Sequence, residues 1–381
     1  MSLKMHVYDR NGEGYDISEI VHSIEYTTSI LGQPGKLSFI VEKDPNDILQ
    51  MALGNMIKFW TVDEFKQETG VFQGYIFNIG TDGTEAYRVL AYDQMRYLQN
   101  HDDWDMSGKS LPEVFEYICE KCQLNHEVFA IPDRSTKVNE KIFIDASYFE
   151  MLQYAIDWTN TYQRPERTND LDIGVYWYIR DNFGTLQLRE VKYCSSHDEN
   201  RLPVDDYLII GDESLLMDYQ YEVDIDKNTF NEFYFTYNDK SKTATTTNTQ
   251  VQRPTPVGAI QAGTPISGTN TSLDGQTIGN DTIPKWGKLR KYVSVNDISD
   301  KDLLAEYMRL NVEHFNEPGR SIKLSALGYD GIYAGSTFVL RLKKLEIDYM
   351  VYVISATHKY DGDTHTMDLE INTNAGMNVL C

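Results

Sequence analysis

The clearest pattern along the chain is a β-meander, a run of strands that alternate apolar and polar residues and are joined by tight turns. It occupies residues 54–93. Its parts, in order, are an alternating strand, an apolar run, a hairpin turn and a further strand: Met56–Thr61, Gly70–Asn78, Asp82-Gly83 and Tyr87–Tyr92. Because period-two alternation and an Asp-Gly turn are typical of half-buried antiparallel strands, we expect a paired sheet here.

The same order of elements returns in residues 335–371. The parts there are Phe338–Leu342, Tyr349–Ala356, Asp361-Gly362 and the alternating Met367, Leu369 and Ile371. From the first glycine to the turn, the intervals are 82 − 54 = 28 and 361 − 335 = 26 positions, and a Lys-Leu-Ser strand precedes each, at 36–38 and 323–325. We interpret this as an internal duplication. The alternative is a chance likeness between two meanders.

Between the two stretches the pattern changes to helical spacing. Ser110-Leu-Pro-Glu113 and Ser147-Tyr-Phe-Glu150 are capping boxes, and each precedes an apolar stripe that recurs every three to four residues. A short strand at 141–145 separates the two expected helices, and an aromatic hairpin is expected at 174–191. Residues 101–205 therefore read as an α+β domain.

The expected fold class is α+β, mainly β, with four parts. Residues 1–100 form a first small β-domain, and the α+β domain is inserted after it. A second, related β-domain is discontinuous, at 206–238 plus 286–381. Residues 239–285 are rich in Thr, Asn, Gly and Pro and have almost no large apolar side chains. Such a segment buries too little surface to offset chain entropy, so we expect a flexible loop.

Composition narrows the classes of partner. The net charge is −23, which argues against binding nucleic acid, because phosphate contacts need clustered Lys and Arg, and against anionic membranes. The simplest reading is an acidic, solvated surface. An apolar run of 18 residues is lacking, so membrane insertion is not expected, and the first residues do not resemble a signal peptide. Four cysteines in 381 residues fit a reducing compartment.

Two cysteine clusters are candidate chemical sites. Cys119-Glu-Lys-Cys122, with His126 nearby, has metal-ligand spacing, but a second pair is missing, so helix packing is the expected role and a metal or redox pair is the alternative. Cys194, His197 and Asp198 have the letters of a catalytic triad. Consecutive residues do not generally form that relay, so we expect a polar turn.

Three further patterns carry weaker signals. His101–Asp105 is acidic but lacks the spacing of a calcium loop, so a solvated loop is expected. His358 and His365 flank the second hairpin turn and are expected to be exposed partners across two strands. No phosphate-binding glycine loop and no hydrolase or metalloprotease motif occurs. We therefore expect no enzyme activity, no cofactor and no metal.

Two stretches carry a resemblance to a known family. They are GYDISEIVHSIEYTTSILGQPGKLSFIVEKD, from residue 14, and WGKLRKYVSVNDISDKDLLAEYMRLNVEHFNEPGRSIKLSALGYDGIYAGS, from residue 286. Both resemble XkdQ-type proteins of PBSX-like prophages, which are relatives of the baseplate hub of contractile phage tails. SLPEVFEYICEKCQLN, from residue 110, is more weakly similar. The likeness lies in the order of the domains rather than in one motif.

The resemblance implies a non-enzymatic hub in the baseplate of a virion or tail-like particle, assembled in the host cytoplasm. The β-domains would be tube-like, and three chains would form a pseudo-six-fold ring that joins the tail tube protein to the spike protein, beside other baseplate proteins. The meander residues expected to support assembly are Ile57, Phe59, Phe72, Ile76, Val89, Phe338, Leu340, Val351, Val353 and Leu369.

Two other functions stay open from the residues alone. A tail-associated cell-wall hydrolase would use Cys119 or Cys194 with a nearby histidine in the α+β domain. A glycan-binding tail module would use exposed aromatic residues such as Tyr176, Trp177 and Tyr178.

Overall fold

The computed structural model is mainly β with few helices, the predicted fold class. The residues that it describes are 2–30, 32–42, 51–81, 86–128, 137–138, 141–162, 177–190, 208–227, 229–238, 273–279, 281–295, 304–305, 308–309, 312, 315–362 and 364–372. They group into two compact units. Unit 1 consists of residues 1–223 and 320–381, and unit 2 of residues 224–319.

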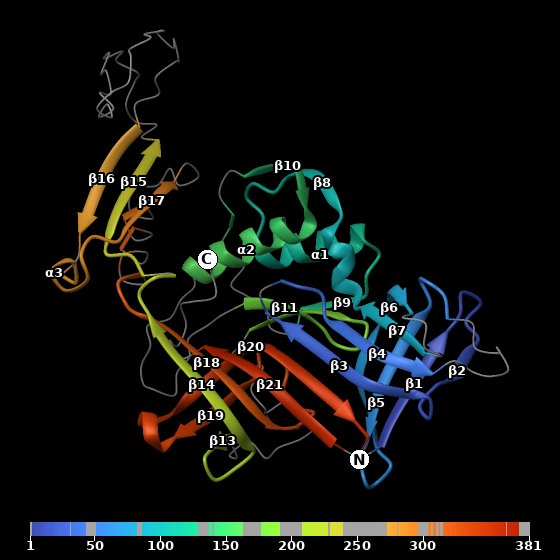
Figure 1. Ribbon diagram of the computed structural model, residues 1–381. Helices are drawn as coiled ribbons and strands as arrows, with labels where there is room; N and C mark the ends of the chain where they lie inside the picture. The colour runs from blue at the N-terminus through green and yellow to red at the C-terminus, as the bar shows by residue number, and fades with distance from the viewer. Residues whose placement is uncertain are drawn as a thin grey trace, which may run out of the picture. The chain divides into compact units, whose positions relative to one another are not determined.

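The first half of unit 1 is a sheet in the strand order β3–β4–β7–β6–β5–β1 (Figure 1). These strands span Val21–Ser29, Lys36–Glu42, Ala86–Tyr92, Glu68–Gly80, Met56–Val62 and Ser2–Tyr8, and β2 (Gly14–Asp16) pairs with β1. All of these neighbours are antiparallel. Every second side chain points into one apolar core, as the alternation predicts.

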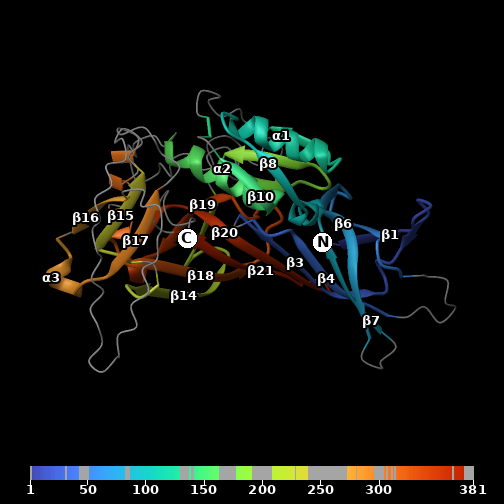
Figure 2. The ribbon, with the colours of Figure 1, turned by 90° about the horizontal axis from the view of Figure 1, so that it is seen from above.

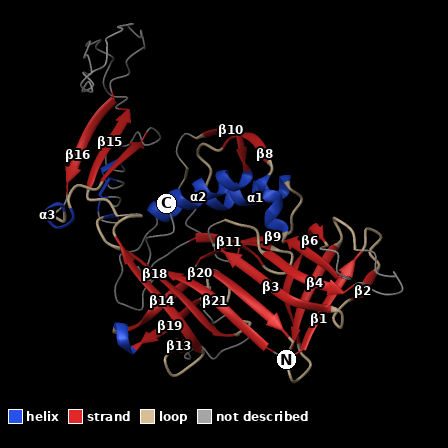
Figure 3. Ribbon diagram, in the orientation of Figure 1, coloured by secondary structure: helices blue, strands red, loops and turns tan. Residues whose placement is uncertain are grey.

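The second half repeats that strand order. Its path is β14–β18–β21–β20–β19–β13. The strands span Leu216–Asp224, Gly319–Leu327, Thr364–Asn372, Ile347–Asp361, Thr337–Leu342 and Ile209–Gly211. One pairing differs: β13 runs parallel to β19, whereas β1 runs antiparallel to β5. We call the two sets of strands copy 1 and copy 2; Figure 3 shows both as strands with few helical turns between them.

Backbone hydrogen bonds fix how the copies correspond. Gly54 and Gly335 both have positive φ, 83° and 90°. The Gly54 N–H donates to the carbonyl of Ile76 at 2.8 Å, and the Gly335 N–H donates to the carbonyl of Val353 at 2.8 Å. A β-bulge follows each acceptor. The two glycines therefore occupy equivalent positions, as the sequence predicts, and only a residue tolerant of positive φ suits them.

The predicted match between the two Lys-Leu-Ser segments is wrong by two residues. Leu37 lies opposite Ala91 in copy 1, whereas the counterpart of Ala91, Ile371, lies opposite Ile322. Leu37 therefore corresponds to Ile322 and not to Leu324. The error is hidden in the sequence because a shift of two positions along a strand keeps every side chain on the same face.

The α+β domain follows copy 1 and begins with the 3-10 helix η1 (Gln94–Gln99). Its helices are α1 (Leu111–Lys121) and α2 (Tyr148–Tyr162), and its strands are β8 (His101–Asp105), β9 (His126–Val128), β10 (Ile142–Ser147), β11 (Trp177–Asp181) and β12 (Leu186–Glu190). Both predicted capping boxes are present, with Glu113 accepting from the Ser110 N–H at 2.8 Å and Glu150 from the Ser147 N–H at 2.7 Å. In Figures 1 and 2, α1 and α2 lie together beside the sheets.

Unit 2 contains β15 (Glu232–Asn238), β16 (Leu273–Gly279), α3 (Ile283–Trp286) and β17 (Arg290–Val295). β15 pairs antiparallel with β16 and parallel with β17. The prediction of a loop over 239–285 is therefore wrong near its end, because residues 273–279 pair as a strand although they are mostly polar. Residues 239–272 lie outside the described residues. Backbone hydrogen bonds need no apolar side chain, so composition does not show this strand.

Unit 2 also divides the predicted second β-domain, 206–238 plus 286–381, at a place that the sequence does not mark. Its β15 and β17 belong with residues 224–319 rather than with copy 2. The helix expected after residue 299 is described in part, and Leu304, Met308, Val312 and Phe315 are buried. The other predicted domain limits, 1–100 and 101–205, stay predictions. Among the described residues, no helix is long and apolar enough to span a membrane.

Candidate assembly surfaces

The two copies are joined by strand pairing. The last part of β20, Ser355–Tyr360, pairs antiparallel with β3 from Ser29 to Ile24. Thr27 and Thr357 contact each other through their hydroxyl groups at 3.0 Å, and the Ser355 hydroxyl donates to the carbonyl of Thr28 at 3.1 Å. β20 thus ends in the sheet of copy 1 after beginning in the sheet of copy 2, and the two sheets are continuous.

Tyr360, at the end of β20, fills the core of copy 1. Its ring lies edge-on to Phe59 with centroids 5.2 Å apart, and 3% of the residue is exposed. Burial raises the pKa of its hydroxyl, which lies 3.5 Å from Asp330. A side chain from copy 2 therefore completes a core that the strands of copy 1 leave open.

A histidine pair lies next to this junction. His358 Nδ1 and His365 Nε2 are 2.9 Å apart, and His358 Nε2 lies 2.7 Å from the carbonyl of Ile332. The prediction that the two histidines face each other across the strands is correct, but the expectation of exposure is wrong, since His358 is 3% exposed. Burial lowers the pKa of His358 to about 4, so its ring is neutral at neutral pH.

β14 is the outer strand at one end of the sheet. Met217, Tyr221 and Val223, which share one face of this strand, are 60%, 38% and 50% exposed. The equivalent strand of copy 1 is β3, where Ile24 and Tyr26 are 1% and 8% exposed because β20 and Tyr360 cover them. β14 therefore carries apolar side chains like those of a buried strand. Among the described residues, however, no strand covers them.

β6 has the complementary feature. It pairs with β5 through Glu68–Tyr75 and with β7 through Tyr75–Gly80. On the β5 side, Asn78–Gly80 have no strand partner among the described residues, whereas the equivalent part of β20 pairs with β3. Phe77 at the bulge is 37% exposed. Within the described chain, one copy thus ends in an uncovered strand and the other in an unused pairing edge.

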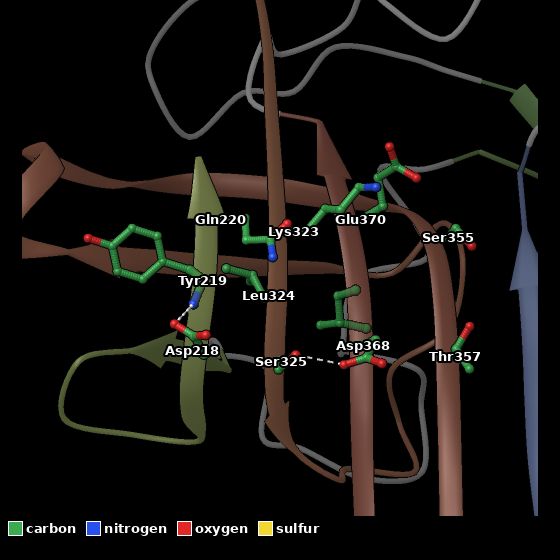
Figure 4. Close-up of a pocket in the computed structure, with 11 residues that line it drawn as sticks. Asp218, Tyr219, Gln220, Lys323, Leu324, Ser325, Ser355, Thr357, Asp368 and Glu370 are labelled. Atoms are coloured by element: carbon green, nitrogen blue, oxygen red, sulfur yellow. Dashed lines mark hydrogen bonds between the residues drawn. The ribbon is translucent and has the colours of Figure 1, made fainter. Parts of the chain in front are cut away.

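The outward face of copy 2 is polar and slightly hollow (Figure 4). Ser325 donates to Asp368 at 2.7 Å, and Lys359 forms an ion pair with the same carboxylate at 2.7 Å. The hollow is also lined by Asp218, Gln220, Lys323, Ser355, Thr357 and Glu370. Side chains of both charge signs alternate there, so this face provides polar contacts rather than a uniformly acidic wall.

The α+β domain is anchored to copy 1 through the turn of its β11–β12 hairpin. Phe183 in that turn packs on Trp60 with ring centroids 5.4 Å apart. Gln94 donates to the carbonyl of Gly184 at 2.6 Å, and Asp181 accepts from the Gly184 N–H at 2.7 Å. Burial raises the pKa of Asp181 to about 6. The ring contact joins the domain to the sheet of copy 1, and the two hydrogen bonds fix the turn that carries Phe183.

The ten meander residues expected to support assembly are all core residues. None is more than 2% exposed, and they divide between the separate cores of copy 1 and copy 2. They can shape the strands but cannot touch a partner directly, and a role in assembly stays a prediction. The surfaces that can reach a partner are the edge strand β14 and the end of β6, Asn78–Gly80. The alternation of apolar residues does not distinguish an edge from a paired strand.

The residues considered as candidates for catalysis or metal binding do not come together in a site among the described residues. Cys119 is buried in α1, where burial raises the pKa of its thiol, and Cys122 caps that helix. His101 contacts the side chain of Asp145 at 3.1 Å on the surface. No cluster of three or more potential metal ligands occurs among the described residues. Cys194, His197 and Asp198 lie outside them.

The predicted aromatic glycan site is not formed. Trp177 and Tyr178 are 3% and 1% exposed, so neither can stack on a sugar, and Tyr176 lies outside the described residues. Tyr178 instead packs with Ile30, Val339 and Tyr352 between the domains of unit 1.

Comparisons with known proteins agree on family and fold. The sequence model of the YQBQ-like family matches residues 24–256 and 275–372. No curated protein sequence matches. The 43 kDa tail protein of prophage MuSo2 from Shewanella oneidensis has a similar structure, with a TM-score of 0.63, 10% identity and coverage of 99% of this chain and 100% of that one.

Two further solved structures are similar. A tail protein from Neisseria meningitidis gives a TM-score of 0.62 at 12% identity, covering 99% of this chain and 98% of that one. A chain of the Francisella PdpA–VgrG complex gives 0.53 at 10% identity, covering 99% of this chain and 58% of that one. At these identities the likeness establishes a shared fold, and the predicted resemblance to tail proteins is confirmed at that level.

Proposed function

This chain belongs to the YQBQ-like family, and from that premise we propose that it is the structural baseplate hub of a contractile phage tail or phage-tail-like particle. In this role it is not an enzyme. It sits in the baseplate after assembly in the bacterial cytoplasm, and it links the tail tube protein to the spike protein beside other baseplate proteins. The similar folds of two tail proteins and of a chain in the Francisella PdpA–VgrG complex support this assignment.

The repeated strand order is the observation that carries the proposal. Three chains with two equivalent copies each supply six similar units, because 3 × 2 = 6. Such a homotrimer matches a six-fold tube on one face and a three-fold spike on the other. Its interfaces are head-to-tail contacts that close by rotation. A chain with a single copy would have to form a hexamer to meet the same tube.

The test is the mass and symmetry of the assembled protein. We expect native mass measurement to give three chains, alone or with the tube protein of the same particle, and electron microscopy to show rings with six similar lobes. A protein that stays a monomer at high concentration and with both tube and spike proteins would disprove the proposal.

A further inference from the structure

We propose that β14 of one chain pairs antiparallel with the end of β6 of a second copy of this chain, in the register in which β20 pairs with β3 inside each chain. This inference rests on the proposed function, because it names the surface through which the trimer closes. The ring would then contain two kinds of junction, one within each chain and one between chains, and the sheet would run through both.

The equivalence of the strands gives the register. The bulges at Phe77 and Ile354 align, so Ile79 corresponds to Ala356, which pairs with Thr28 inside the chain. On the other side, Tyr26 pairs with Leu37, whose counterpart is Ile322. A Cβ added to Gly319 would lie 3.7 Å from the carbonyl oxygen of Asp224, so these two residues are close across β14 and β18.

Counting inward along β14 and β18 from that contact places Tyr221 opposite Ile322 and hence in the position of Tyr26. Val223 then takes the position of Thr28. Residues 218–220 and 323–325 line one hollow, which agrees with this antiparallel alignment. The expected contact between chains is therefore Ile79 opposite Val223.

The exposed side chains of β14 support a second copy of this chain as the partner. Met217, Tyr221 and Val223 face the side that β20 and Tyr360 cover in copy 1. An isolated, uncovered edge strand with apolar side chains is prone to irregular association, so it is expected to be covered in the working protein. The strand that fits by shape and register is the counterpart of β20, namely β6, and it is already present on every other copy.

Aromatic residues occur at both junctions. Within the chain, Tyr360 comes from the inserting strand. On the receiving side, Tyr221 takes the position of Tyr26, so both receiving strands have a tyrosine at this place. The junction within the chain contains Tyr360 in addition to the tyrosine of the receiving strand.

A pair of engineered cysteines tests the register. In the double variant Ile79→Cys with Val223→Cys, mild oxidation should link each chain to both neighbours and give a covalent trimer on a non-reducing gel. Paired strand positions lie within the Cα separation that a disulfide tolerates. The matched control is Phe65→Cys with Val223→Cys, since Phe65 is 83% exposed in the turn that precedes β6 and should give no trimer.

A charge substitution provides a second readout if the cysteine variant folds poorly. Tyr221→Lys should weaken trimer association at least about 10-fold, because a buried, unpaired charge is costly. Ile144→Lys, at a site 77% exposed in the α+β domain, should leave the trimer intact. A wild-type trimer that shows neither the cross-link nor sensitivity at Tyr221 would overturn this inference and leave the proposed function standing. A wild-type protein that never forms a trimer would overturn both.

Discussion

At the residue scale, the fold of unit 1 depends on side chains that serve two copies at once. Tyr360 is the clearest of these, because it belongs to copy 2 by sequence and to the core of copy 1 by contact. The sequence shows it only as the last residue before a hairpin turn. Its role follows from the length of β20, which no local pattern defines.

Replacing Tyr360 by alanine should lower the free energy of unfolding by about 3–5 kcal/mol, the usual cost of removing a large buried ring. Phe65→Ala is the control, since 83% of that side chain is exposed and the change should be within about 0.5 kcal/mol. Urea unfolding of both variants measures the difference. Equal, small effects would show that Tyr360 does not join the copies.

His358 should make stability fall with acid. Its pKa is about 4 in the folded chain, compared with 6.5 ordinarily, so the folded state binds this proton less readily. The part of the unfolding free energy that depends on neutral His358 is therefore fully present above about pH 6.5 and is lost as the pH falls towards 4. It amounts to about 3 kcal/mol at most. In His358→Gln, the difference in unfolding free energy between pH 7 and pH 4.5 should shrink by about 2 kcal/mol, and an unchanged difference would contradict this account.

At the scale of elements, the alternation of apolar residues predicted the strands and their inward faces correctly, because burial of one sheet face imposes a period of two. The capping boxes predicted both starts of helices for a similar local reason. Strand partners are set by long-range geometry instead. That is why the sequence indicated two β-domains but not the β20–β3 pairing or the two-residue shift at Leu37. For the same reason it did not indicate the edge of β14 that has no strand partner among the described residues.

Gly54 and Gly335 give a matched test of the repeat. Both have positive φ, so an alanine is strained at either site by about 1 kcal/mol. A Cβ at Gly54 meets only an arginine nitrogen at 3.7 Å, whereas at Gly335 it would lie 2.1 Å from the ring of Tyr178. Thermal unfolding should therefore show a small loss for Gly54→Ala and a loss of about 3 kcal/mol or more for Gly335→Ala. Similar losses at the two sites would contradict the claim that the two glycines share a backbone conformation but differ in their surroundings.

At the scale of the whole molecule, unit 2 occupies a connection that is short in copy 1. Residues 30–35 join β3 to β4, whereas residues 225–318 join the equivalent β14 to β18. Unit 2 is therefore an insertion into a turn of the repeated fold. The sequence indicated a polar interruption there, but not the parallel and antiparallel pairing of β15 with its two neighbours.

Replacing residues 225–318 by a turn of the length of 30–35 should leave unit 1 folded, because copy 1 shows that the strands need no more to pair. Circular dichroism and thermal unfolding should report a cooperative β-protein. A variant that fails to fold even though its full-length parent is stable would show that copy 2 depends on unit 2.

The measurement that tests the central claim most directly is an electron cryomicroscopy reconstruction of the protein bound to its tail tube. The account predicts three chains in which copy 1 and copy 2 alternate around the axis, related by about 60°. A ring of six chains, or three chains whose copies are not interchangeable by that rotation, would contradict it.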